Sequence, residues 1–312
     1  MERLETEIYL RYRQIIESQG FVVPAGGELP APWRVRMQDL LDRYDAFCFD
    51  GYGTLYNRGS FVYEGALDWY TMLRAAGKHM RLITNAASDV DSVLAADAGK
   101  RGFAFCEAET ISSGSLLKDL CVELRGRGKA VREVYYIGRE TGKHVLESCG
   151  ITAVALDAEP AEPIVAISSA KDTPESYAQA VKILQKPGAM LLVLNSDAWA
   201  PKIPGDDGVT VREAVSGALS ERLRRDSMCS ANGGAGCETF YLGKPFPAIW
   251  GKVKRSLPDG ARVLMVGDTL GTDVLGAKVA GFDSALVVGR NVPADELESD
   301  EAVLGIRPDY YI

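Results

Sequence analysis

The feature that most constrains this chain is an apolar run that ends at a carboxylate. The run from Tyr44 to Phe49 reads as a buried strand, Asp50 follows it, and Gly51 and Gly53 then allow a tight turn in which the backbone can approach a ligand closely. Open α/β sheets bind ligands in the crevice beyond the carboxyl ends of their strands. Asp50 is therefore placed as a nucleophile or metal ligand, although an isolated Asp-Gly also begins many ordinary turns.

Three later stretches repeat this design, each with polar residues just beyond an apolar run. These residues are Thr84 and Asn85, then Lys244, then Asp268 with Asp273. If the strands are parallel, the side chains converge at one sheet edge and supply carboxylates, a hydroxyl, an amide and one ammonium. Carboxylate oxygens suit Mg²⁺ better than zinc, and phosphoryl transfer depends mainly on positioning and charge neutralisation. The pattern predicts a site for magnesium and phosphate.

The composition excludes several other classes of function. The 312 residues carry a net charge of −8, which argues against nucleic acid or an anionic membrane surface as the main partner. No apolar segment is long enough to span a membrane, and the first residues lack a signal-peptide pattern, so we expect a cytoplasmic protein. Six scattered cysteines and two histidines leave little material for a zinc site or a histidine-dependent triad.

The order of elements predicts an α/β protein with more than one unit. Residues 1–20 carry an apolar stripe at helical spacing and are followed by a Pro/Gly-rich segment, which favours a docking helix and a linker. Strands alternating with helices over about a hundred residues, from the strand at Val134 to the helix ending at Arg225, are enough for a second α/β unit. No phosphate-binding P-loop or complete dinucleotide fingerprint is present.

The four polar stretches resemble the motifs of one known family. D-x-[DYW]-G-T at Asp50, Thr84-Asn85, G-K-P at Lys244 and G-D-x-x-x-T-D at Asp268 are similar, in order and spacing, to the four motifs of the haloacid-dehalogenase-like (HAD) hydrolases. The interval from Asp50 to Thr84 is too short for a cap domain, whereas the interval from Thr84 to Lys244 is long enough. The chain therefore resembles the C2-capped class IIA branch of p-nitrophenylphosphatase, phosphoglycolate and pyridoxal phosphatases.

The resemblance implies a fold and its division into domains. The fold is a doubly wound, mostly parallel, Rossmann-like HAD core with an inserted α/β cap of the C2 type. We expect an N-terminal helix and linker at 1–33, the core at 34–131 and 239–312, and the cap at 132–238.

The resemblance also implies roles for individual residues. Asp50 would attack phosphorus to give an aspartyl-phosphate. Asp50, the carbonyl of Tyr52 and Asp268 would bind Mg²⁺, with Asp273 holding metal-bound water. The phosphoryl group would be held by the turn glycines and the polar groups of the next two motifs, namely Gly51, Gly53, Thr84, Asn85 and Lys244.

Tyr52 departs from the pattern of the resembled phosphatases, which have at this position an aspartate that acts as general acid and base. A phenol with a pKa near 10 is a poor base at neutral pH, and losing acid–base catalysis costs about 10²- to 10⁴-fold in rate. Three outcomes stay open: a slow phosphatase for substrates with good leaving groups, recruitment of an acid–base group from the cap, or no phosphatase activity at all.

Two further functions therefore stand beside a phosphatase of small phosphomonoesters. The stretch Phe49–Tyr56 resembles the first motif of metal-independent 2-haloacid dehalogenases. Those dehalogenases, however, carry their cap after the first motif and lack the G-D-x-x-x-T-D motif that this chain has at Asp268. A non-catalytic protein that binds a phosphorylated metabolite is the other alternative.

The segment Asn195-x-Asp197 is expected to be cap structure near the cleft. The resemblance implies homodimer contacts through the cap, and the N-terminal helix is a second candidate for them; the substrate cannot be read from the sequence.

Overall fold

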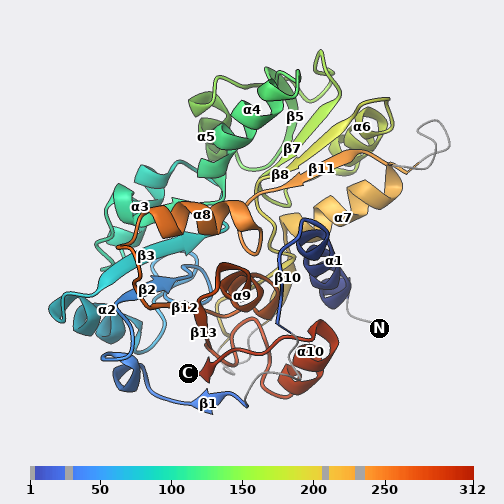
Figure 1. Cartoon of the computed structure of the whole chain (residues 1–312). Coiled ribbons are helices and arrows are strands. Elements are labelled where there is room, and N and C mark those ends of the chain that lie inside the picture. Colours follow the sequence, from blue (N-terminus) through green and yellow to red (C-terminus); the bar gives the residue numbers. More distant parts are fainter. Residues whose placement is uncertain (1–3, 25–30, 206–210, 229–235) are drawn as a thin grey trace.

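The computed structural model describes residues 4–24, 31–205, 211–228 and 236–312. These residues form two sheets, in each of which all paired strands are parallel, and one antiparallel hairpin. Figure 1 shows the smaller sheet above the larger one, each with its own helices. The chain therefore has the α/β class that its strand and helix patterns predict.

The larger sheet has its switch of strand order at the strand that precedes Asp50. In spatial order its strands are β1 (Trp33–Arg34), β14 (Tyr310–Tyr311), β13 (Asp283–Leu286), β12 (Val263–Gly267), β2 (Ala46–Phe49), β3 (His79–Thr84) and β4 (Thr110–Ser112). From β2 the chain adds β3 and β4 on one side, and the later β12, β13 and β14 lie on the other. The crevice beyond β2 and β12 is where such sheets bind ligands.

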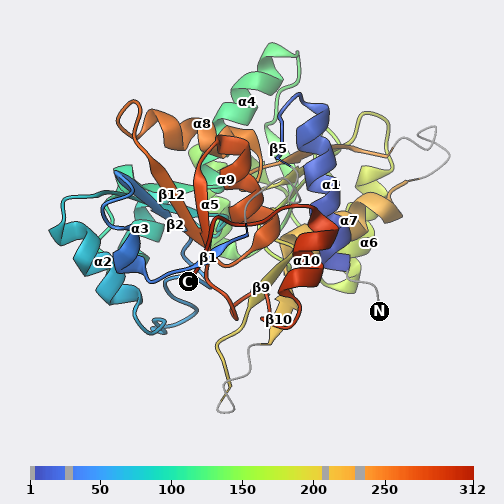
Figure 2. The same ribbon diagram turned by 60° about the horizontal axis from the view of Figure 1, so that its bottom comes forward.

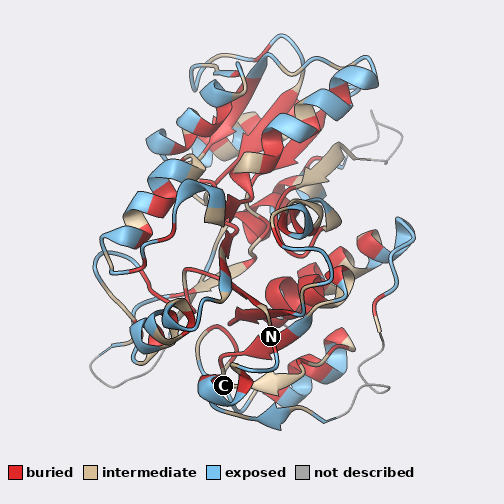
Figure 3. Cartoon of the chain, turned by 60° about the vertical axis from the view of Figure 1, so that its left-hand side comes forward, coloured by how far each residue is buried: buried red, intermediate tan, exposed pale blue. Residues whose placement is uncertain are grey.

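Strand β2 is buried on both faces, which explains its continuous apolar run. Successive side chains of a strand point to opposite faces. Phe47 and Phe49 accordingly pack in one apolar cluster, whereas Ala46 and Cys48 pack in another. Figure 3 shows the strands buried between helices whose outer surfaces are exposed.

The smaller sheet shares an apolar core with the larger one. Its strands, in spatial order, are β11 (Glu238–Tyr241), β8 (Met190–Val193), β7 (Ile164–Ile167), β5 (Glu133–Ile137) and β6 (Thr152–Ala153). One face packs in a cluster that also contains residues of β2 and β12, and the other packs under two helices of its own. We call residues 133–241, which contain this sheet, the smaller unit, and residues 33–132 and 242–312, which contain the larger sheet, the larger unit.

Helices surround both sheets. The α-helices are α1 (Leu4–Ser18), α2 (Ala66–Ala75), α3 (Asp91–Gly99), α4 (Leu117–Gly126), α5 (Lys143–Ser148), α6 (Pro174–Leu184), α7 (Ser216–Asp226), α8 (Pro247–Arg255), α9 (Leu275–Ala280) and α10 (Leu297–Leu304). Short 3₁₀ turns are η2 (Met37–Leu40), η3 (Glu107–Glu109), η4 (Gly114–Leu116) and η5 (Glu140–Gly142), and η7 (Leu270–Val274) is a π-helical turn.

The hairpin of β9 (Trp199–Pro201) and β10 (Arg212–Ala214) reaches from the smaller unit to the larger sheet. Figure 2 shows it beside α10. Asn57 donates a hydrogen bond to the carbonyl of Pro201 at 3.0 Å, and Asn291 donates one to the carbonyl of Trp199 at 3.2 Å. Two loops of the larger sheet thus hold this hairpin over the crevice.

The division into N-terminal helix, core and cap stays a prediction about independent domains. The strands of the smaller sheet come from 133–241, so β11 crosses the predicted boundary between 238 and 239. Part of the predicted linker, residues 25–30, lies outside the described residues. Among the helices of the described ranges, none has the length and apolar character needed to cross a membrane.

Candidate active site

Asp50 lies at the first position after β2, where the sheet changes strand order. It is buried, and its backbone N–H donates to the carbonyl of Val266 in β12 at 2.9 Å. Its Oδ2 accepts a long hydrogen bond of 3.4 Å from Thr54. Gly53 has φ of +100°, and a Cβ there would lie 1.9 Å from Asp268 Oδ2. Glycine is required at this position because the turn passes directly over a second carboxylate.

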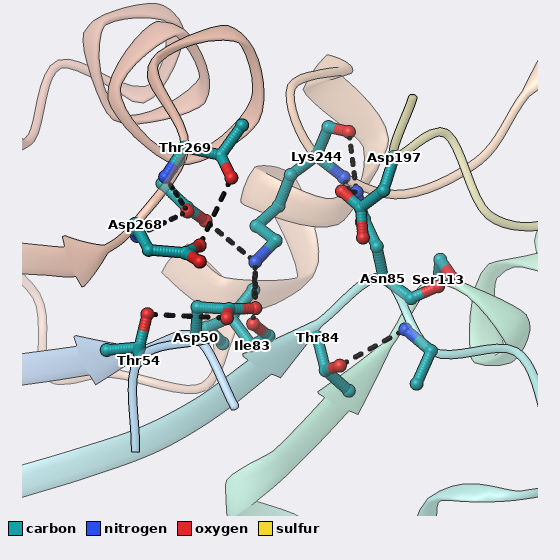
Figure 4. Close-up of polar contacts among 12 residues, drawn as sticks. Asp50, Thr54, Ile83, Thr84, Asn85, Ser113, Asp197, Lys244, Asp268 and Thr269 are labelled. Carbon is teal, nitrogen blue, oxygen red and sulfur yellow. Dashed lines mark hydrogen bonds and ion pairs between the residues drawn. The ribbon is translucent and has the colours of Figure 1, made fainter. Parts of the chain in front are cut away.

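Lys244 is the cation at the centre of the site. Its Nζ lies 2.5 Å from Asp50 Oδ1 and 2.7 Å from Asp273 Oδ1, and it donates to the carbonyl of Ile83 at 3.1 Å. Figure 4 shows these contacts converging from different elements. Burial lowers the pKa of Lys244, but the surrounding carboxylates outweigh burial and hold that pKa above its usual range. The lysine is therefore charged and joins residues distant in the sequence.

Three buried carboxylates, Asp50, Asp268 and Asp273, meet beside this lysine. Each offers an oxygen, and the three oxygens lie within 4.8 Å of one another. Burial raises the pKa of Asp50 to about 7, and burial with the neighbouring carboxylates raises the pKa of Asp268 well above its usual range. Within the described ranges Asp268 Oδ2 has no hydrogen-bond partner. One ammonium does not compensate three carboxylates, so the residues fit a divalent cation.

Asp273 is held by the backbone of the turn that it follows. Its Oδ2 accepts hydrogen bonds from the N–H groups of Asp268 and Thr269, both at 3.1 Å. A Cβ at Gly267 would lie 2.2 Å from the Asp273 carboxyl carbon. These contacts leave Asp273 Oδ1 to face Lys244, which agrees with a supporting position beside the metal ligands.

Thr84 is the last residue of β3 and Asn85 follows it, so both lie at the predicted strand end, but they face different surroundings. Thr84 lines the cavity, and its Oγ1 accepts from the N–H of Ala86 at 3.1 Å. Asn85 accepts at Oδ1 from the N–H of Lys244 at 2.7 Å and donates to Asp197 Oδ1 at 2.8 Å. Its amide therefore positions the lysine loop, while its predicted contact with phosphate stays a prediction.

The phenol of Tyr52 is directed toward α3. It donates to Asp97 Oδ2 at 3.4 Å, and its ring packs edge-on against Tyr56 with centroids 5.1 Å apart. Burial is the main cause that raises the pKa of Tyr52. Asp97 also receives a hydrogen bond of 2.6 Å from Arg101. Neither partner is predicted from the sequence, because nothing in the pattern of residues 91–101 marks their face as lining a site.

Asp197 is a further carboxyl of the cavity, contributed by the smaller unit. It follows β8, it lines the same cavity as Asp50, and burial raises its pKa to about 6. From the sequence, Asn195-x-Asp197 is predicted to be cap structure near the cleft. A signal for a site residue was present, because Asp197 lies four residues beyond the end of β8, a buried strand, on the carboxyl side where such sheets bind ligands.

The cavity has a volume of about 370 Å³ and is lined by both units. Asp50, Thr84 and Asp268 lie at strand ends of the larger sheet, Lys244 lies in the loop between β11 and α8, and Asp197 belongs to the smaller unit. The cavity is therefore large enough for a small metabolite, and its wall carries a carboxylate, a candidate cation site and an ammonium group.

This combination of a doubly wound sheet and converging Asp, Lys and Asp-Asp motifs defines a HAD-type hydrolase centre. Residues 47–152 match a family model described as haloacid dehalogenase-like hydrolase, and residues 241–312 match a second HAD-hydrolase-like model. The two matches together cover more than half of the chain. The chain belongs to the HAD-like hydrolases and, with its relatives, to their class IIA branch.

Relatives match over nearly the whole chain. Mouse chronophin is 27% identical over 88% of this chain and 92% of its own length. The 4-nitrophenylphosphatase of Schizosaccharomyces pombe is 25% identical over 88% and 93%. A crystal structure from Cytophaga hutchinsonii, titled a possible sugar phosphatase of the HAD superfamily, superimposes with a TM-score of 0.73 at 23% identity and covers 90% of this chain and 97% of its own. The structural likeness supports the fold.

Proposed function

We propose that the chain is a Mg²⁺-dependent phosphatase of small phosphomonoesters that works through an aspartyl-phosphate on Asp50. The observation that carries the proposal is the meeting of Asp50, Asp268 and Asp273 around Lys244 at the switch point of the sheet. The 4-nitrophenylphosphatase relative supports the phosphatase class. In this proposal the smaller unit is a C2-type cap that closes over the substrate.

The proposed chemistry assigns a task to each group. A carboxylate oxygen of Asp50 forms a bond to phosphorus while the ester oxygen leaves, and water then releases phosphate and regenerates Asp50. Asp50, Asp268 and the carbonyl of Tyr52 would hold Mg²⁺, supported by Asp273. When bound, Mg²⁺ supplies positive charge that offsets charge on the phosphoryl oxygens. Lys244 carries the protein's own positive charge at the same place, and Thr84 offers a hydroxyl to phosphate.

The proposed enzyme is slow on esters with poor leaving groups. Tyr52 occupies the place of the usual acid–base aspartate, but its phenol donates to Asp97 on α3. Without general acid–base catalysis the rate falls by about 10²- to 10⁴-fold. Asp197 is the carboxyl of the smaller unit that faces the same cavity and is the candidate to replace it.

The test is hydrolysis of p-nitrophenyl phosphate with and without Mg²⁺, beside 2-chloropropionate. We expect nitrophenol release that requires Mg²⁺, disappears after chelation and is abolished in Asp50→Asn. The control is Asp259→Asn, since Asp259 is exposed and is not among the residues that line the cavity. Chloride release without metal would instead establish the dehalogenase.

A non-catalytic role has one observation in its favour, the replacement of the acid–base aspartate by Tyr52. It would be established by Mg²⁺-dependent vanadate or phosphate binding with no turnover of either substrate. We further propose a small phosphorylated metabolite as partner, a homodimer formed through the cap and a cytoplasmic location. The hydrolysis assay does not depend on any of these three.

A further inference from the structure

The cavity has a second polar region that the proposed phosphoryl chemistry does not use. It is formed by the phenol of Tyr52 and the side chains of Asp97 and Arg101 from the larger unit, and by Arg139 and Ser169 from the smaller unit. We call these five residues the arginine region. It contains two guanidinium groups and one carboxylate, so its net charge is positive.

Arg101 is the buried member of the arginine region. Its side chain is 6% exposed, and its guanidinium lies over the Tyr56 ring at 4.8 Å from the centroid. Nη1 donates to the backbone carbonyl of Asp97 at 2.7 Å and to its carboxylate at 2.6 Å. Nε is buried and, among the described residues, has no acceptor. A buried N–H without an acceptor is costly, so this donor is suited to an oxygen of a ligand.

Arg139 and Ser169 approach the same region from the smaller unit. Arg139 follows β5 and Ser169 lies two residues after β7, its neighbour in the parallel sheet, so both lie beyond the same sheet edge. Arg139 is exposed, and over the described ranges its guanidinium has no hydrogen-bond or ion-pair partner. It lines the same cavity as Tyr52 and Arg101, so it faces the larger unit across that cavity. Ser169 Oγ is buried and likewise lacks a partner there.

We propose that the arginine region binds a second anionic group of the substrate, so that the preferred substrates are phosphomonoesters that also carry a carboxylate or another phosphate. Asp97 neutralises one guanidinium, and one positive charge with unpartnered N–H and O–H donors remains for the ligand. Arginine suits this task because its planar N–H groups match carboxylate and phosphate oxygens. The inference rests on the proposed phosphatase function and specifies its substrate class.

Three esters of equal chain length test the proposal: phosphoglycolate, ethyl phosphate and phosphoethanolamine, whose far ends are anionic, neutral and cationic. Because a hydrogen bond to a charged group contributes about 1.5–3 kcal/mol, we expect kcat/KM for phosphoglycolate to exceed that for ethyl phosphate by about tenfold or more. We expect phosphoethanolamine to be the poorest of the three. A bisphosphate, glycerol 1,3-bisphosphate, compared with glycerol 1-phosphate distinguishes a phosphate from a carboxylate. Equal kcat/KM in both comparisons overturns the proposal.

Substitutions test whether the arginine region causes the preference for an anionic substrate. In Arg139→Ala we expect the ratio of kcat/KM between phosphoglycolate and ethyl phosphate to fall toward one, and Arg101→Lys, which keeps the charge beside Asp97, to lower it severalfold. Arg125→Ala is the matched control, because Arg125 is an exposed arginine on α4 outside the cavity lining, and its ratio should equal that of the wild type. An unchanged ratio in Arg139→Ala would contradict the assignment.

A binding measurement separates this inference from the proposed function. Calorimetry compares 3-phosphonopropionate with propylphosphonate, which cannot be hydrolysed, on the wild-type protein with Mg²⁺. Tighter binding of the carboxylated compound, lost in Arg139→Ala, supports the arginine region even when no ester is turned over. Turnover of simple esters without any preference in binding would support the phosphatase and reject the anion site.

Discussion

At the scale of single residues, Tyr52 decides how the proposed reaction obtains its proton. Its hydroxyl is directed to Asp97, and its ring is packed against Tyr56. We therefore expect Tyr52→Phe to keep turnover of p-nitrophenyl phosphate within about threefold, because the ring contacts remain and the lost hydrogen bond is long. Steady-state kinetics measure this directly. A loss of about 10²-fold or more would show that the phenol itself is the general acid.

The converse substitution tests what the site lacks. Tyr52→Asp restores the residue of the resembled phosphatases, and we expect faster turnover of alkyl phosphates, whose leaving groups need a proton, by about 10²-fold. The gain for p-nitrophenyl phosphate should be smaller, because nitrophenolate leaves without protonation. A uniform change for both substrates would mean that the substitution altered binding or folding instead of proton transfer.

Asp197 gives the protein a pH-dependent stability of known sign. Burial raises its pKa from 3.8 to about 6, so the folded state binds this proton more tightly than the unfolded state. The stabilising contribution is complete below about pH 4 and is lost as the pH rises to about 6. The free energy of unfolding of the wild type, relative to Asp197→Asn, should therefore fall across this interval by on the order of 3 kcal/mol at most. Denaturant titrations from pH 4 to 7.5 measure it, and a pH-independent difference would contradict it.

At the scale of elements, the turn after β2 shapes the metal site through Gly53. An alanine there would have a positive φ and a Cβ 1.9 Å from Asp268 Oδ2. We expect Gly53→Ala to cost about 3 kcal/mol or more and to abolish stabilisation by Mg²⁺. Gly59→Ala is the control, because Gly59 also has a positive φ but a Cβ would meet nothing within 4 Å, so about 1 kcal/mol is expected. Thermal unfolding with and without Mg²⁺ compares the two variants. Equal losses of unfolding free energy in Gly53→Ala and Gly59→Ala would reject the steric argument.

The sequence was sufficient to place the strands that carry the site. β2 and β12 are apolar runs buried on both faces, and each ends at a carboxylate, so the meeting of Asp50 with Asp268 follows from parallel pairing at a switch point. The direction of the Tyr52 phenol could not be read in the same way. It depends on Asp97 of α3 and on Arg101 in the turn after that helix, and contacts between distant elements follow from packing that a one-dimensional pattern does not encode.

At the scale of the whole molecule, α1 connects the two units. Arg11 forms a 2.9 Å ion pair with Glu221 of α7, and Arg13 donates to the carbonyl of Leu304 of α10 at 2.7 Å. Tyr12 is buried and donates to the carbonyl of Ser196 at 2.9 Å. The helix predicted within residues 1–20 therefore contacts α7 and Ser196 of the smaller unit as well as α10 beside the larger sheet. These contacts restrict how far the smaller unit can move from the crevice.

Removing the central side chain of α1 should loosen both units together. Tyr12 contacts Tyr241 and Phe246 with ring centroids 5.0 and 5.1 Å apart, so Tyr12→Ala leaves a cavity and should cost about 3–5 kcal/mol in unfolding free energy. Tyr12→Phe keeps the ring and should cost about 1 kcal/mol, from the lost hydrogen bond to Ser196. Urea denaturation gives both values.

Hydrogen exchange shows where the alanine variant is loosened. We expect faster exchange in α7 and η7, because α1 contacts both, while β2 and β3, which α1 does not contact, stay protected. Unchanged exchange in α7 would mean that α1 does not join the units, and the restriction on the cap would then have to come from the β9–β10 hairpin.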